Sequence, residues 1–375
     1  MADEPLYDED QQGVVDAGPD ERLFVIAGPG TGKTYTLIGR IARLVLECGL
    51  APGSVLVMSF TKSAVNVVRG ELSKRGAALG DVEPRTFDSW GTWLLRRRGE
   101  LSDGELDELD YTERIEEATG LVRRDPTVLS GVRHLVVDEV QDLVGVRAAL
   151  VLAFIDALPE GCGVTLLGDP CQSLYDYQVA RTRGMTSERF RDAVMGRGDF
   201  ARLSLETEHR SGGSRPDWYS AALGTMRRWI LARDLRAASV ATARAMYEMR
   251  ERGVVLSLEE AAGLMGDRGL SKVGVLTRTN RDADRTYRRL RSEGVECARV
   301  KAEPYSGGDG VAEAGVSVLT VHASKGSQFD TVLVTMEAVE LFEGAMDLAG
   351  SEELAEAKVA YVALTRSKGS TLVVS

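Results

Sequence analysis

Val25-Ile-Ala-Gly-Pro-Gly-Thr-Gly-Lys-Thr34 is the stretch that decides the fold of this chain. It predicts a short β-strand, a glycine-rich loop and the first turn of a helix, and Ala27–Thr34 fits the phosphate-binding loop pattern. Glycines let successive backbone N–H groups curve around phosphate oxygens, and the helix directs its positive end at the anion. The amphipathic run from Leu37 to Val45 agrees with such a helix. A nucleoside triphosphate site is therefore predicted here.

The side chains of this loop suit a magnesium–nucleotide complex. Lys33 supplies a positive charge for the β- and γ-phosphates, and Thr34 offers a hydroxyl to Mg²⁺. ATP and Mg²⁺ are therefore the expected cofactors. The loop residues expected to contact the nucleotide are Ala27, Gly28, Gly30, Thr31, Gly32, Lys33 and Thr34.

Composition excludes several classes of protein. The chain has 375 residues with 43% apolar and 27% charged side chains, which is a normal globular balance. No apolar run is long enough to span a bilayer, and the acidic N-terminus does not resemble a secretory signal, so we expect a cytoplasmic protein without membrane contact. The four cysteines are isolated from one another, which predicts free thiols and no cysteine metal site. A net charge of −11 argues against a protein that coats polyanions, but allows a local nucleic-acid channel.

Apolar runs alternate with helical stretches along the whole chain. Several runs lack alternation, which favours parallel strands buried on both faces and hence a doubly wound α/β fold. A helical stretch is expected through Trp218–Met249, and the break around Ser211–Pro216 predicts two domains, 1–212 and 213–375. The expected strands are Leu23–Ala27, Val55–Ser59, His134–Val137, Gly163–Leu167, Arg202–Glu206, Val273–Thr277, Gly315–Thr320, Thr331–Val334 and Thr371–Val374.

Two acids end the strand within Leu135-Val-Val-Asp-Glu-Val-Gln-Asp142. Beside a phosphate loop, Asp138 suits a ligand of Mg²⁺, and Glu139 suits a base that orients and deprotonates the attacking water. A further strand ends in Gly168-Asp-Pro, and Gln172 just beyond it is a candidate sensor of the γ-phosphate.

Taken in order, these motifs resemble those of the UvrD/Rep-type superfamily 1 DNA helicases over nearly the whole chain. The similar segments are Asp10-Gln-Gln-Gly-Val-Val15, the phosphate loop, Ser59-Phe-Thr-Lys-Ser-Ala64, Thr86-Phe-Asp-Ser89, Asp138-Glu-Val-Gln-Asp142, Gly168-Asp-Pro-Cys-Gln-Ser-Leu-Tyr175, Leu205-Glu-Thr-Glu-His-Arg-Ser211, Thr320-Val-His-Ala-Ser-Lys-Gly-Ser-Gln-Phe329 and Ala360-Tyr-Val-Ala-Leu-Thr-Arg-Ser367. The resemblance implies two tandem RecA-like P-loop NTPase domains with parallel sheets, and ATP hydrolysis between them.

The resemblance also implies roles for particular residues. Arg210 and Arg366 match the arginine fingers of the family, which stabilise charge on the transferring phosphoryl group. Gln11 matches its adenine-reading glutamine. Further nucleotide contacts are implied for Tyr35, His209, Gly326 and Gln328, of which Tyr35, His209 and Gln328 replace the usual Arg, Tyr and Glu.

Single-stranded DNA contacts are implied as well. Aromatic rings bind single strands by stacking on bases, although the same rings also suit core packing. The candidates are Phe60, Thr61, Thr86, Ser89, Tyr175, Tyr177, His322 and Ser324. Asp88 replaces a common His and is unfavourable near phosphate. Two arginine clusters, Arg96–Arg98 and Arg281–Arg291, suit either DNA contact or a solvated helix face.

The chain departs from the family in its insertions. Only a reduced 1B insertion fits near residues 94–133, and no 2B insertion fits in the second domain. We therefore predict an ATP-dependent translocase or helicase on single-stranded DNA or tailed duplex, running 3′ to 5′ by resemblance. The alternative is a DNA-stimulated ATPase subunit of a repair or anti-phage defence complex, with a protein partner supplying duplex handling. An RNA-directed enzyme is a third possibility.

Overall fold

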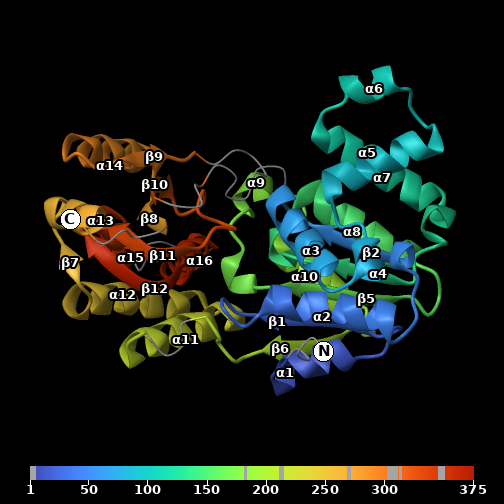
Figure 1. Ribbon diagram of the computed structural model, residues 1–375, viewed down its shortest axis with the longest axis horizontal. Coiled ribbons are helices and arrows are strands. Elements are labelled where there is room, and N and C mark those ends of the chain that lie inside the picture. Colours follow the sequence, from blue (N-terminus) through green and yellow to red (C-terminus); the bar gives the residue numbers. More distant parts are fainter. Residues whose placement is uncertain are drawn as a thin grey trace. The chain divides into compact units, whose positions relative to one another are not determined.

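The computed structural model describes residues 6–180, 184–210, 215–267, 272–301, 311, 315–344 and 351–375 (Figure 1). The chain divides into two compact units, Met1–His209 and Arg210–Ser375. This division lies a few residues before the expected boundary at 212/213. Ser211 of the predicted motif, and residues 302–310 and 312–314, lie outside the described residues.

Unit 1 is built on a six-stranded parallel sheet in the order β3-β2-β4-β5-β1-β6. The strands are β1 (Arg22–Ala27), β2 (Val55–Ser59), β3 (Arg85–Thr86), β4 (His134–Val137), β5 (Gly163–Gly168) and β6 (Ala201–Leu205). Because parallel strands end at one edge of a sheet, the loops that follow β1, β4 and β5 come together there.

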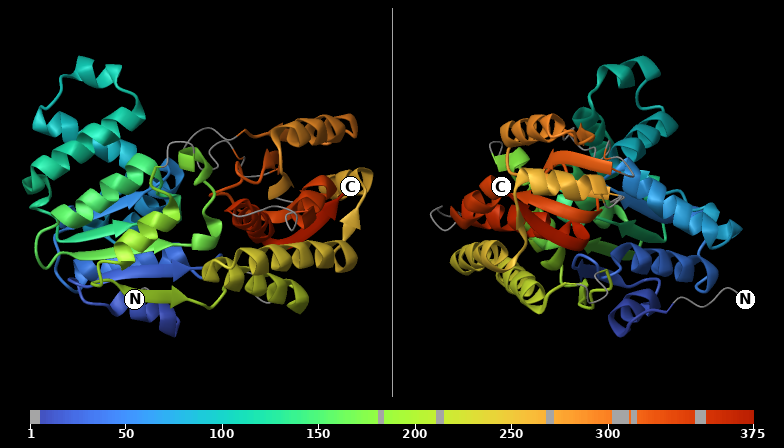
Figure 2. Two further views of the ribbon diagram at one scale, coloured as in Figure 1. Left: turned by 180° about the vertical axis from the view of Figure 1, so that it is seen from behind. Right: turned by 60° about the vertical axis from the view of Figure 1, so that its left-hand side comes forward.

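Helices cover both faces of this sheet, and α5, α6 and α7 form a small group that extends away from it (Figures 1 and 2). The helices of unit 1 are α1 (Glu9–Asp16), α2 (Lys33–Leu46), α3 (Lys62–Lys74), α4 (Ala77–Gly80), α5 (Phe87–Arg98), α6 (Asp103–Glu108), α7 (Tyr111–Arg124), α8 (Gly145–Ala157), α9 (Tyr177–Ala180) and α10 (Ser187–Met195). The α5–α7 group corresponds to the stretch in which the reduced insertion is expected.

Unit 2 contains a second six-stranded parallel sheet, in the order β7-β12-β11-β8-β10-β9. The strands are β7 (Val255–Leu256), β8 (Lys272–Thr277), β9 (Cys297–Arg299), β10 (Gly315–Thr320), β11 (Phe329–Thr335) and β12 (Ser367–Val374). The helices are α11 (Asp217–Ala232), α12 (Leu235–Arg252), α13 (Leu258–Asp267), α14 (Asn280–Ser292), α15 (Met336–Glu343) and α16 (Ser351–Thr365). Within the described ranges, no helix is long and apolar enough to cross a membrane.

The two parallel sheets confirm the predicted α/β class, and every expected strand is present. The two-residue strands β3 and β7 were not predicted, because two residues carry no readable pattern. The short strand β9 lies where one short strand was expected, after the helix of residues 282–292. The expected single helical stretch through Trp218–Met249 is wrong in one respect. It consists of two helices, because Arg233 adopts a left-handed φ of 56° and Asp234 then caps α12 by accepting from the Ala237 amide.

A buried arginine fixes α1 against the phosphate-loop helix. Arg40 of α2 is fully buried and donates to the carbonyl oxygens of Val15, Ala17 and Gly18, at the end of α1. The last carbonyls of a helix lack partners within it, and here the two Nη groups of Arg40 supply the missing donors. The contact holds α1, and with it Gln11, beside the phosphate loop.

Candidate functional site

The phosphate loop has the backbone that its glycines predict. Gly30 and Gly32 adopt φ angles of 81° and 73°, a left-handed region that glycine enters without strain. The Thr31 hydroxyl closes the loop by donating to the Gly28 carbonyl at 2.9 Å. Gly32 is the N-cap of α2 and has no side chain to accept from the first amides of the helix. The positive end of α2 is therefore directed at the loop, as an anion site requires.

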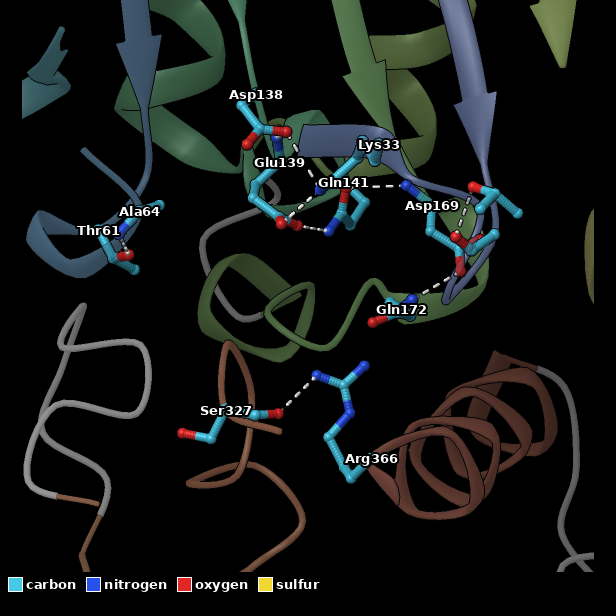
Figure 3. A network of polar contacts seen from close by, with 12 residues as sticks. Lys33, Thr61, Ala64, Asp138, Glu139, Gln141, Asp169, Gln172, Ser327 and Arg366 are labelled. Carbon is cyan, nitrogen blue, oxygen red and sulfur yellow. Dashed lines mark hydrogen bonds and ion pairs between the residues drawn. The ribbon is translucent and has the colours of Figure 1, made fainter. Parts of the chain in front are cut away.

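Lys33 forms ion pairs with both predicted catalytic acids (Figure 3). Its ammonium lies 3.1 Å from Asp138 and also contacts the carboxylate of Glu139. Burial opposes the charge on Lys33, but attraction to Asp138 and then to Glu139 outweighs it and raises the pKa of the lysine. Burial also raises the pKa of Asp138, against the attraction of Lys33. The loop lysine and the two acids therefore share one buried charge cluster.

Glu139 is held in this cluster by a strained backbone and a glutamine. It adopts a left-handed φ of 56°, which is uncommon for a side chain of this size. Gln141 donates through Nε2 to the Glu139 carboxylate, and its Oε1 accepts from the Asp169 amide at 3.0 Å. A Cβ at Gly168 would lie 2.5 Å from the same Oε1, so the glutamine needs a glycine there. Gln141 thus ties Glu139 to the end of β5.

Gln141 was missed as a site residue by sequence reasoning. The only sequence signal was its place two residues after the paired acids. The predicted γ-phosphate sensor, Gln172, joins the same network by donating to Asp169 at 2.7 Å. The structure therefore brings Lys33, Asp138, Glu139 and Gln172 to one edge of the sheet.

The oxygen ligands expected for Mg²⁺ are also at this edge. Thr34 lies in the first turn of α2, half-buried, and the Asp138 carboxylate is buried beside Lys33. Among the described residues, no group of three or more His, Cys, Asp or Glu could hold a metal by itself. One hydroxyl and one carboxylate fit Mg²⁺, which usually takes few protein ligands and completes its shell with phosphate and water.

The residues predicted to contact the adenine side of the nucleotide lie near the phosphate loop, toward helix α1. Gln11 is only 3% exposed; it donates to the Thr31 carbonyl at 3.1 Å and accepts from the Asp8 amide at 3.3 Å. His209 lies 2.7 Å from Asp8, and its backbone amide donates to the Gly30 carbonyl. The Tyr35 ring lies 5.0 Å from the ring of Tyr7, with the guanidinium of Arg75 5.3 Å from its centre. Gln11, Tyr35 and His209 are thus joined to the loop, Gln11 and His209 through hydrogen bonds.

Two predicted stacking rings are packed inside unit 1. Phe60 is 3% and Tyr175 8% exposed, and their rings stack on each other at 5.4 Å with an interplanar angle of 18°. The expectation of an open stacking platform is therefore corrected for both rings, because the loops after β2 and β5 bury them against each other. Tyr177, at 61% exposed, is the predicted aromatic that faces solvent.

The predicted polar DNA contacts of unit 1 begin two helices. The Thr61 hydroxyl accepts from the Ala64 amide, and Thr86 and Ser89 form a capping box. Thr86 and Ser89 also line a groove of about 590 Å³, together with Lys62, Arg69 and Arg85 among others. Asp88, expected to be unfavourable near phosphate, is neutralised by Arg147 at 2.8 Å.

In unit 2 both predicted finger arginines are attached to neighbouring backbone. Arg366 follows α16, is 5% exposed and donates to the Ser327 carbonyl at 3.4 Å (Figure 3). Arg210 donates to the Thr365 carbonyl at 3.1 Å. Arg210 therefore contacts the end of α16, the residue that precedes Arg366.

The remaining predicted residues of unit 2 follow β10. Gly326 adopts a left-handed φ of 79°, and it and Gln328 are exposed. Burial, and then the charge of Arg278, lower the pKa of His322 to about 4, so its ring is neutral at pH 7. Ser324 is fully buried and donates to the Val321 carbonyl at 2.7 Å. The expected phosphate contact of its side chain is therefore corrected.

Comparisons with known protein families agree with the motifs. The UvrD/REP helicase N-terminal domain matches residues 7–117, and the UvrD-like helicase C-terminal domain matches residues 308–375. Both the phosphate loop and the segments around Gly326 and Arg366 fall within these matches.

Similar proteins include three bacterial helicases. ATP-dependent DNA helicase UvrD2 of Mycobacterium tuberculosis (strain ATCC 25618 / H37Rv) is 37% identical over 104 residues, which is 26% of this chain and 15% of that protein. ATP-dependent DNA helicase PcrA of Bacillus subtilis (strain 168) is 37% identical over 79 residues, covering 21% of this chain and 11% of the relative. DNA helicase II of Escherichia coli (strain K12) is 34% identical over 92 residues, covering 24% and 12%. Each match thus spans less than a fifth of the relative's length.

A solved structure shows the same fold. The Pif1 helicase of Candida albicans matches 99% of this chain and 95% of its own with a TM-score of 0.54, at 12% sequence identity. At that identity the likeness concerns the fold alone.

Proposed function

The chain belongs to the UvrD/REP-type helicases, and from this premise we propose that it is an ATP-dependent translocase or helicase on single-stranded DNA, moving 3′ to 5′. The observation that carries the proposal is the cluster in which Lys33 of the phosphate loop pairs with Asp138 and Glu139. A phosphate-binding ammonium, a metal-binding carboxylate and a base are the groups that phosphoryl transfer to water requires.

The ion pairs of Lys33 with Asp138 and Glu139 represent the site without nucleotide, and we expect bound ATP to break them. Phosphate oxygens compete for the Lys33 ammonium, which frees the carboxylates of Asp138 and Glu139. Thr34 and Asp138 are the residues that would hold Mg²⁺, which would supply positive charge beside the phosphates. Glu139, positioned by Gln141, accepts the proton of the attacking water. Arg210 and Arg366 are the arginines proposed to stabilise the charge of the transferring phosphoryl group, and Gln172 to sense it.

The test is ATP turnover by the whole chain with and without single-stranded DNA. We expect DNA to stimulate hydrolysis, and strand displacement to occur on duplexes with a 3′ tail but not on those with a 5′ tail. An ATPase that ignores DNA would contradict the proposal, and displacement from 5′ tails alone would reverse the polarity. The same assay with single-stranded RNA decides between DNA and RNA as the activating strand.

A second candidate is a DNA-stimulated ATPase subunit with little unwinding of its own. It is favoured by the short segments where the family carries insertions: α5–α7 in unit 1, and the 22 residues between α14 and β10 in unit 2, whose described part contains β9. Efficient strand displacement by the isolated chain would count against this candidate. Strong DNA-stimulated ATPase without displacement, on every tail tested, would favour it.

A further inference from the structure

Helix α14 lies on the outside of unit 2 (Figures 1 and 2), and its sequence is rich in arginine. Successive residues of an α-helix turn by about 100°, so Arg281, Arg285 and Arg288 fall on the side opposite the buried Ala283, Thr286 and Leu290, and Arg289 and Arg291 lie on its two flanks. We call this surface the arginine face; its members, all exposed, are Arg281, Arg285, Arg288, Arg289 and Arg291. The face is strongly cationic in a chain whose net charge is −11.

Among the described residues, neighbouring acids form ion pairs with one arginine of this face, Arg285. Asp282 and Glu337 both pair with Arg285 at 2.9 Å. Asp284, the other acid of the helix, pairs with Arg299 of β9 at 2.7 Å. The other four arginines of the face form no ion pair with any described residue.

Helix stability does not explain the arrangement. Like charges three or four residues apart, such as Arg281 with Arg285, destabilise a helix. Arg289 and Arg291 in the last turn complement the helix dipole, but Arg281 lies in the first turn, where positive charge opposes it. The helix would be more stable with a neutral side chain in place of Arg281. We therefore expect this positive charge to serve the binding of a negatively charged ligand.

We propose that the arginine face binds the phosphate backbone of duplex DNA. The proposal rests on the proposed function, because it extends the DNA contact of the same enzyme. From Arg281 to Arg289 the helix rises about 12 Å. A duplex carries one negative charge per about 1.7 Å of axis, so a duplex of that length carries roughly seven charges on its two strands. Guanidinium groups bind phosphates in pairs of hydrogen bonds without reading sequence.

The face fits a duplex better than a single strand. Sequence-independent binding of single strands combines charge with aromatic rings on which bases stack. The aromatic side chain of α14 is Tyr287, which is partly buried and packs against the core of the unit. The face thus presents cations without a stacking ring, which is the pattern of phosphate contact alone.

The test compares two triple variants of the full chain. Arg281→Gln/Arg288→Gln/Arg289→Gln removes charge from the face and keeps helix propensity. Arg236→Gln/Arg244→Gln/Arg252→Gln is the matched control, with three exposed arginines on α12 of the same unit. Binding of a blunt duplex and of a single strand is measured against salt concentration, and thermal unfolding verifies the fold.

The face variant is expected to bind duplex at least tenfold more weakly at about 0.1 M salt, with a salt slope smaller by two to three. Its single-strand affinity should change less than threefold, and the control should retain duplex binding. Unchanged duplex binding, an equal loss in the control, or an equal loss for single strands would each overturn the proposal. DNA-stimulated ATPase of the wild-type chain is measured separately, so failure of the proposed function is distinguishable from failure of the face.

Discussion

Two charged regions of this chain are built in opposite ways. The Lys33–Asp138–Glu139 cluster joins charges of opposite sign at the buried ends of strands, and Gln141 holds one of its acids in place. The arginine face of α14 places like charges side by side on an exposed surface. Buried paired charges interact strongly and tolerate little displacement, whereas exposed charges act through a field that salt screens. Substitutions in the first region should therefore have large, specific effects, and those in the second small, salt-dependent ones.

The largest effect is expected from removing the base of the buried cluster. Glu139→Gln keeps the shape of the side chain but cannot accept a proton, so kcat of DNA-stimulated ATP hydrolysis should fall about 10²–10⁴-fold. Nucleotide affinity should be retained, which fluorescent-nucleotide binding would show. A wild-type turnover rate in this variant would refute the assigned role.

The buried histidine His134, which lies away from the phosphate loop, predicts a pH dependence of stability. Burial, and then the charge of Arg40, lower the pKa of His134 to about 4, and its ring contacts the Pro19 carbonyl and the Thr165 hydroxyl. Because the unfolded chain binds the proton near pH 6.5, stability should fall as the pH drops from about 6.5 to about 4, by roughly 3 kcal/mol for this group. In His134→Gln this part of the pH dependence should disappear. Urea denaturation between pH 4.5 and 7 measures it, and a gap between the proteins that does not vary with pH would contradict the account.

A matched pair of glycines separates backbone strain from the close packing of the phosphate loop. Gly32 and Gly49 have φ angles of 73° and 71°, but a Cβ at Gly32 would lie 2.5 Å from Gln11, while a Cβ at Gly49 meets nothing within 4 Å. Gly49→Ala should lower the free energy of unfolding by about 1 kcal/mol through strain alone. Gly32→Ala should lower it by about 2 kcal/mol and also impair ATP hydrolysis. Equal losses of stability, with activity intact, would show that the loop has room for a side chain.

The positioning of the base is tested at Gln141. In Gln141→Ala the Glu139 carboxylate loses its donor, and kcat should fall about tenfold with little change in KM for ATP. Gln141→Glu should be worse, because it replaces the donor with a second negative charge. If the alanine variant were slower than the glutamate variant, filling of space would matter more than the hydrogen bond.

The smallest effect is expected at the arginine face, and with the opposite sign. Arg281→Gln removes a positive charge from the positive end of α14 and from its neighbour Arg285, so the free energy of unfolding should rise by about 0.5 kcal/mol. Denaturation at low salt measures the gain, which should shrink at high salt. A clear loss of stability would mean that Arg281 makes a stabilising ion pair in the folded protein. The arginine face would then not differ from the Lys33 cluster in having unpaired charges.

Much of the fold was predictable because parallel strands buried on both faces read as unbroken apolar runs. His134–Val137 and Gly315–Thr320 were predicted to the residue. The edge strands β3 and β7 were not, because they have two residues each and their pairing depends on the neighbouring strand rather than on their own sequence.

The candidate site divides in the same way. The phosphate loop and the paired acids could be predicted because the residues that give them their chemistry are adjacent in the sequence. The burial of Phe60 against Tyr175 was not, because it joins loops that are distant in the chain. The same holds for Gln141, whose two partners lie on different strand ends.

By itself, then, the sequence determined the α/β class, the order of the motifs and the residue types of a triphosphate site, because these follow from local periodicity and local chemistry. Only the tertiary structure decided that Lys33 pairs with both acids, that Gln141 ties one of them to β5, and that four of the five exposed arginines of α14 form no ion pair with a described residue. Those facts depend on the order of strands in the sheet and on which side of a helix is covered, and no single segment of the chain contains that information.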